Sequence, residues 1–244
     1  MPTHYDIIVS GKDAPDIVVT PVPGKDGKVL GPEGNGTPGK AGWFTCEDQA
    51  GPGQPGNHGW GAPQAEAGAN GQPAWTVTIE CSEFSGAPLS LCNNGGHGAK
   101  GQDGGKGGDG TDGGNAGHQP WHCKDLVLGG IGGDAGSGGN AGPGGNGGNA
   151  ANVTVWTGKD LTGTPVGGDN RGGTQGKAGD YGAPGKPGTG GKNSDGSLAS
   201  SGANPGSGLP AKDGDPGKGG TFAQRGSSKP STYLKIAIIS QLAE

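Results

Sequence analysis

Glycine recurs at every third position over long stretches of this chain. Three runs of seven triplets keep the frame without a break: Gly95–Gly113, Gly130–Gly148 and Gly173–Gly191. A three-residue period matches the polyproline-II conformation, which makes no hydrogen bonds within its own helix. Buried backbone groups must nevertheless be paired, so such helices must bond to neighbouring helices. A row without side chains allows the close approach that this bonding needs, and the period therefore predicts a bundle of polyglycine-II helices.

Three further windows have the same length but are interrupted. They are Gly24–Gly42, in which Leu30 and Glu33 break the frame, Gly53–Gly71 and Gly202–Gly220. We therefore expect about six antiparallel, left-handed Gly-X-Y helices in a layered sandwich over residues 24–220. With 62 Gly among 244 residues, α-helix is not expected, because each Gly in a helix interior costs about 1 kcal/mol relative to Ala.

Two other kinds of chain share this composition. A collagen triple helix needs Pro-rich triplets, whereas Gly95–Gly113 contains no Pro. Gly-rich chains without a core are commonly disordered linkers. The equal run lengths and the β-like segments between the runs favour an ordered bundle. Each run also carries one polar row, and we expect the alternating Lys and Asp of Gly95–Gly113 to face solvent.

Segments rich in β-branched residues lie between the runs and at both ends of the chain. If successive runs are antiparallel, these segments gather at the end of the bundle that holds both termini, where we expect a small β cap. We treat residues 1–244 as one domain, with residues 1–23 and 221–244 in the cap. The expected strands are Tyr5–Val9, Asp16–Val22, Trp75–Cys81, Leu89–Cys92, Val153–Trp156 and Tyr233–Ile239.

The same chain path predicts how the four cysteines pair. Cys46 and Cys123 lie in connectors at the end opposite the termini, whereas Cys81 and Cys92 flank one short hairpin in the cap. Of the three possible pairings we expect Cys46–Cys123 and Cys81–Cys92. Two disulfides favour an oxidising final location. The first residues do not resemble a signal peptide, so either the chain is mature or it leaves its cell by lysis or another route. We expect an extracellular or virion-surface location.

The distal connectors hold the candidate binding residues, because aromatic side chains are scarce elsewhere and loops on a rigid scaffold commonly carry function. The alternative is that Trp43, Phe44 and Trp121 form a hydrophobic plug around a disulfide. A zinc site at His118, His122, Cys123 and Cys46 is a further alternative, although a disulfide would consume its thiols. Trp60 is an aromatic residue inside a run, and the pattern does not explain it. The candidates are Trp43, Phe44, Glu47, His118, Trp121 and His122.

Other function classes are not favoured by the sequence. A net charge of −5 argues against nucleic-acid binding, and no stretch of about 20 apolar residues is present to span a membrane. Residues 107–112 resemble a calcium-binding nonapeptide turn, but position 114 lacks the large aliphatic residue that the repeat needs. Nucleophile, phosphate-loop and zinc-protease motifs are missing. We expect no enzyme activity, cofactor or resident metal.

The runs at 104–110 and 144–149 resemble the polyglycine-II bundles of two groups of proteins. One group is the tip adhesins of some phage long tail fibres, whose polyglycine sandwich presents variable loops to a bacterial receptor. The other is the springtail antifreeze proteins. The resemblance covers residues 24–220 by pattern, and it implies a fold rather than individual binding residues.

The sequence favours a non-enzymatic, adhesin-type protein whose distal loops bind a glycan or a membrane protein on a cell surface. The β cap would attach it to a carrier. An alternative is a structural subunit of an extracellular fibre that assembles by strand addition through Tyr5–Val9 or Tyr233–Ile239. A second alternative is an ice-binding protein, although the charged exposed rows suit liquid hydration better than ice.

Overall fold

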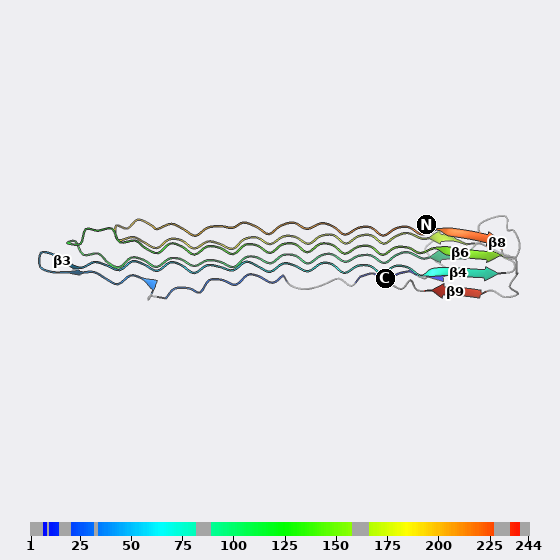
Figure 1. Ribbon diagram of the computed structural model, residues 1–244, viewed down its shortest axis with the longest axis horizontal. Coiled ribbons are helices and arrows are strands. Elements are labelled where there is room, and N and C mark those ends of the chain that lie inside the picture. Colours follow the sequence, from blue (N-terminus) through cyan, green and yellow to red (C-terminus); the bar gives the residue numbers. More distant parts are fainter. Residues whose placement is uncertain are drawn as a thin grey trace.

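The computed structural model describes residues 7–8, 10–14, 21–31, 34–81, 89–157, 166–226 and 235–239. The molecule is a long, thin rod in which most of the chain runs lengthwise, and most strands gather at one end (Figure 1). We call this the strand end and the opposite end the tip. The described residues contain no α-helix. Their strands are β1 (Ile7–Ile8), β2 (Lys40–Ala41), β3 (Cys46–Asp48), β4 (Thr76–Cys81), β5 (Leu89–Cys92), β6 (Val153–Thr157), β7 (Val166–Asp169), β8 (Phe222–Gly226) and β9 (Lys235–Ile239).

Six extended segments form the shaft of the rod, and backbone hydrogen bonds join them at three-residue intervals. Consecutive segments run antiparallel: for example, the N–H groups of successive glycines from Gly130 to Gly148 in segment 4 donate to segment 3 in descending order, from Gly114 to Gly96. By residue number, segment 1 covers 10–14, 21–31 and 34–42, segment 2 covers 50–74, segment 3 covers 93–117, segment 4 covers 129–152, segment 5 covers 170–191, and segment 6 covers 199–220.

The segments form two layers, in each of which the neighbours are parallel. The odd layer holds segments 1, 3 and 5, and its bonds include Gly24 N–H to the Lys106 carbonyl at 2.7 Å. The even layer holds segments 2, 4 and 6, and its bonds include Gly59 N–H to the Asp134 carbonyl at 2.8 Å. A side-chain-free row is needed here: a Cβ atom on Gly107 would overlap the Gly136 carbonyl of the other layer. We propose that the six segments are polyglycine-II helices, which would account for the three-residue spacing of the bonds.

The exposed polar rows have a structural role that the sequence did not reveal. In each layer, their side chains accept N–H groups of the next segment that have no backbone acceptor among the described residues. Asp134 Oδ1 accepts from Ala203 N–H at 2.6 Å, and His97 Nδ1 accepts from Thr174 N–H at 3.0 Å. We call this set the side-chain ladder. Further acceptors in it are Asn70, Asn94, Asp103, Asp109, Asp112, Asn115, Asn140, Asn146, Asn149 and Asn152.

The ladder predicts a dependence of stability on acid. Hydrogen bonds from Lys100 and Lys106 lower the pKa of Asp103 and Asp109, and the N–H and hydroxyl of Thr189 lower the pKa of Asp112. A lowered folded-state pKa stabilises the fold fully above the unfolded value of about 4, and this contribution is lost as the pH falls through the folded value.

We therefore expect the variant D103N/D109N/D112N to lose less stability than the native protein between neutral pH and acid. Asn keeps an acceptor oxygen for each N–H but does not titrate. Urea unfolding at both pH values measures the difference. Equal losses in the two proteins would show that these carboxylates do not cause the acid sensitivity.

At the strand end, both layers continue into parallel sheets in the same order. β1, β5 and β7 extend the odd layer, whereas β4, β6 and β8 extend the even layer. β9 adds to β4 in the antiparallel sense. The two sheets supply the cluster of large apolar side chains that forms the core of the described residues, and Phe222 packs against it. The core residues are Val77, Ile79, Leu91, Val153 and Val155.

Two expectations about this end were wrong. β4 and β5 are not a hairpin, since they belong to different sheets. Cys81 ends β4 away from the shaft, whereas Cys92 lies where β5 enters segment 3, and Cys92 is a free thiol. The expected Cys81–Cys92 disulfide is therefore not formed.

Residues ahead of position 24 also bond to the shaft. Gly11 and Ala14 donate N–H groups to Asn94 and His97 of segment 3, so this part of the chain belongs to the shaft. The expected strand Asp16–Val22 lies outside the described residues except at its last two positions, which are not in a strand.

Candidate functional site

The tip consists of three connectors, at residues 43–49, 118–128 and 192–198. The first holds β3, which pairs in the antiparallel sense with β2 at the end of segment 1. A disulfide between Cys46 and Cys123 joins the first connector to the second, with the two Cα atoms 4.8 Å apart. This pairing confirms the expectation from the chain path.

Polar contacts tie the connectors together beyond the disulfide. Gln49 Nε2 of the first connector donates to Asp125 Oδ2 of the second at 2.5 Å, and Gln119 Oε1 accepts from Ala50 N–H, at the start of segment 2, at 2.9 Å. The second and third connectors are joined where Ser194 N–H donates to the Val127 carbonyl at 2.8 Å. The Ser194 hydroxyl in turn accepts from Val127 N–H at 2.9 Å. The backbone of the tip is thus fixed by contacts among all three connectors.

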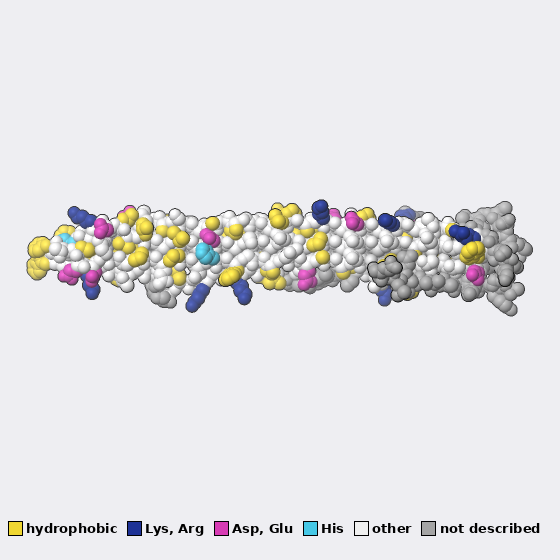
Figure 2. Space-filling view, viewed as in Figure 1, with side chains coloured by type: hydrophobic (Ala, Val, Ile, Leu, Met, Phe, Trp, Pro, Cys, Tyr) yellow, Lys and Arg dark blue, Asp and Glu magenta, His cyan; other side chains and the backbone are white. Residues whose placement is uncertain are grey.

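Three aromatic side chains predicted as binding residues are almost fully exposed at this end. Trp43 is 87%, Phe44 79% and Trp121 80% exposed. The rings of Trp43 and Phe44 lie 6.2 Å apart between centroids. Figure 2 shows hydrophobic side chains gathered at the left-hand end of the rod, the end that carries β3 in Figure 1. This exposure contradicts the alternative that the three aromatics are buried as a plug around the disulfide.

Aliphatic side chains near the tip are exposed as well, and the sequence analysis did not select them as site residues. They come from the second and third connectors and the start of segment 4: Leu126, Leu128, Ile131 and Leu198. Large aliphatic residues are rare in the runs, so their concentration near the distal connectors was a usable signal. Together with Trp43, Phe44 and Trp121 they form what we call the apolar tip.

The polar candidates lie at the same end. Glu47 and His118 are exposed, and His122 is half-buried with its ring against that of Trp121. The Cys46–Cys123 disulfide leaves neither thiolate available for the zinc site considered from the sequence. No group of three or more His, Cys, Asp or Glu side chains among the described residues is arranged to hold a metal ion.

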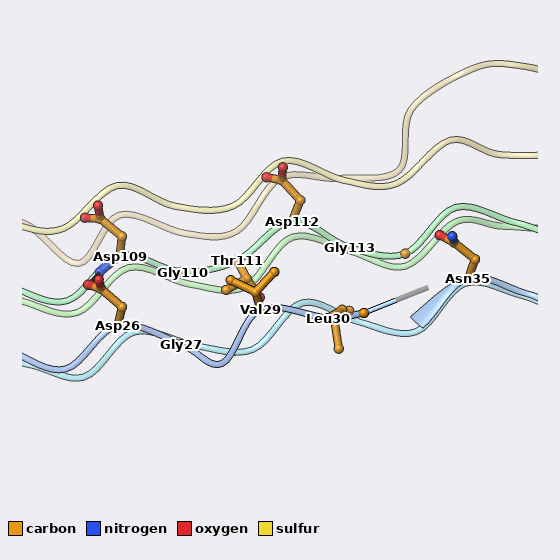
Figure 3. Close-up of a pocket in the computed structure, with 12 residues that line it drawn as sticks. Asp26, Gly27, Val29, Leu30, Asn35, Asp109, Gly110, Thr111, Asp112 and Gly113 are labelled. Carbon is orange, nitrogen blue, oxygen red and sulfur yellow. Dashed lines mark hydrogen bonds between the residues drawn. The ribbon is translucent and has the colours of Figure 1, made fainter. Parts of the chain in front are cut away.

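A cavity of about 600 Å³ opens on the side of the shaft, where segment 1 departs from segment 3. Gly27 N–H donates to the Asp109 carbonyl, and Gly36 N–H donates to the Asn115 carbonyl. Between these two bonds segment 1 advances by nine residues, whereas segment 3 advances by six. In Figure 3 the carboxylates of Asp109 and Asp112 turn towards segment 5. There they accept N–H groups of Lys186 and Thr189, so these two carboxylates serve the ladder rather than the cavity.

Comparisons with known proteins found no relative of this chain. No protein-family model, no curated protein and no solved structure matches it. Among the described residues, none of the secondary structure is a helix with the length and apolarity needed to cross a bilayer.

Proposed function

We propose that this protein is a non-enzymatic, adhesin-type binding protein that uses the apolar tip to hold a receptor on a cell surface. The proposal rests on the exposure of Trp43, Phe44 and Trp121 on connectors that a disulfide and several hydrogen bonds hold in place. Exposed aromatic anchors on a rigid support are the usual centres of binding energy at interfaces. The shaft would act as a stiff spacer between the receptor and a carrier at the strand end.

The chemistry of the tip favours a protein receptor over a glycan. Four aliphatic side chains accompany the aromatics, and aliphatic groups gain free energy by leaving water for another apolar surface. The disulfide suits an oxidising environment such as the cell exterior or a virion surface.

Substituting the two tip tryptophans tests this function. We expect W43A/W121A to lose receptor binding by at least about a hundredfold, since two anchors at about 2 kcal/mol each are removed. The fold should be retained because both side chains are exposed. Binding of labelled protein to receptor-bearing cells measures the loss, with Y181A on the exposed flank of the shaft as the matched control. Undiminished binding by the double variant would rule out the tip as the receptor site.

One observation favours the fibre alternative as a second candidate. Among the described strands, β1 pairs only with β5 and β9 only with β4, so each is an edge of its sheet. Edge strands are templates for pairing with another chain. Filaments that lengthen with protein concentration in electron micrographs would favour a fibre subunit, whereas single rods at all concentrations would favour the adhesin.

A further inference from the structure

Trp60 lies on a narrow edge of the rod where the layer has no further segment. Its N–H donates to the Lys25 carbonyl at 2.8 Å, as Gly136 N–H of segment 4 donates to the Gly108 carbonyl at 2.8 Å. The two residues therefore occupy the same row of neighbouring segments. A Cβ on Gly136 would overlap the carbonyl of Trp60 in segment 2. This row must therefore be free of side chains wherever the preceding segment of the same layer lies beside it. Segment 2 has no such neighbour among the described residues, and Trp60 projects from the edge.

Two lysines share this edge by the same argument. The Lys25 carbonyl accepts an N–H from segment 2, as the Gly108 carbonyl accepts an N–H from segment 4. Lys25 therefore takes the position in segment 1 that Gly108 takes in segment 3. A Cβ on Gly108 would overlap the Lys25 carbonyl, so the row of Lys25 also points outward. Lys28 lies one triplet towards the tip, where its carbonyl accepts from Asn57 Nδ2 at 2.5 Å. Both lysines are exposed.

The edge permits a large side chain but does not require one. Trp60 is 70% exposed, so its indole contributes little to the stability of the rod and leaves a large apolar surface in water. The other positions of its row in segment 2 are polar, small or Pro: Gly51, Gln54, Asn57, Pro63, Glu66, Ala69 and Gln72. The packing of the rod therefore does not account for a tryptophan at this place.

We propose that the edge formed by Trp60, Lys25 and Lys28 binds an acidic, carboxylate-bearing polysaccharide. The flat, exposed indole offers a face on which a sugar ring stacks, and the two ammonium groups complement carboxylates on the sugar. The Asp26 carboxylate between the lysines accepts Asp109 N–H at 2.8 Å, so it is directed to segment 3 rather than to the ligand. A straight edge suits a linear polymer. The site lies on the shaft and is independent of the apolar tip.

Oligogalacturonate is the probe, with neutral dextran oligomers as the comparison, in calorimetric titrations at low and high salt. We expect the native protein to bind oligogalacturonate more tightly than dextran, and less tightly as salt rises. W60A should weaken binding about tenfold or more. K25Q/K28Q should weaken it and remove most of the salt dependence, whereas L209A on the opposite edge should leave it unchanged.

Three results would overturn the proposal. They are no binding of oligogalacturonate by the native protein, equal binding by W60A, and association of native rods that is lost in W60A. The last result would assign the edge to a second copy of the chain. Because these substitutions leave Trp43 and Trp121 unchanged, receptor binding at the tip can be measured independently of oligogalacturonate binding.

Discussion

Replacing Gly107 by Ala is expected to lower the midpoint of thermal unfolding by about 10 °C. Gly107 is buried at the contact between layers, where an added Cβ would overlap the carbonyl of Gly136 and crowd that of Ser137. These are backbone atoms, so no side-chain rotation relieves the overlap. Segments 3 and 4 must separate, and this weakens the bonds that tie both to their neighbours. Forced overpacking of this kind costs about 3 kcal/mol.

G167A is the matched control. A Cβ on Gly167 in β7 meets no atom within 4 Å, so the same chemical change should alter stability by less than about 1 kcal/mol. Calorimetry on both variants, with circular dichroism to verify the fold, makes the comparison. Equal, small shifts in the two variants would show that the layers are not in close backbone contact at Gly107.

The triplet frame of the runs can be read from the sequence because glycine placement is a local property. The tip disulfide was predictable for a related reason: the path of antiparallel runs places Cys46 and Cys123 at one end, and the structure confirms their pairing. The position of the aromatic candidates at the distal connectors followed from the same path. Their exposure did not, because a hydrophobic plug and an open binding surface share one sequence.

Which strands share a sheet at the strand end could not be predicted from the sequence. Cys81 and Cys92 are close in sequence, which favoured a hairpin. Their strands instead continue segments of different layers, so β4 pairs with β6 and β9 while β5 pairs with β1 and β7. That choice depends on which segments are neighbours in a layer, a relation between residues about 75 positions apart. The nearest residues in sequence are therefore not the partners.

One physical rule explains both Trp60 and the break at Leu30: a side chain fits in a row only where no neighbouring segment lies against that row. Trp60 is allowed because no preceding segment lies beside its row among the residues that the structure describes. In segment 3 the corresponding row does face a neighbouring segment, since Cβ atoms added to Gly108 and Gly114 would overlap segment 1. Thr111 lies between these two glycines in the same row and nevertheless carries a side chain. Segment 1 departs from segment 3 at this level. A single sequence shows the triplet frame, but only the arrangement of segments shows which row faces a neighbour.

Removing the tip disulfide in C46A/C123A is expected to lower the free energy of unfolding by about 4 kcal/mol, because a cross-link spanning 77 residues restricts the unfolded chain. The shaft should still form, since most of its backbone hydrogen bonds join one segment to another and do not involve the connectors. The midpoint of thermal unfolding should fall by about 10 °C, and hydrogen exchange should quicken most at residues 43–49 and 118–128.

C92A is the control for the loss of a thiol without the loss of a cross-link, since Cys92 is free. Its Sγ lies 3.4 Å from the Ser10 hydroxyl, a weak contact whose removal should cost about 1 kcal/mol. If C46A/C123A and C92A are equally stable, the cross-link does not hold the tip. If only the double variant is destabilised and it also binds receptor-bearing cells more weakly, the fixed geometry of the apolar tip contributes to affinity by ordering Trp43 and Trp121 before contact.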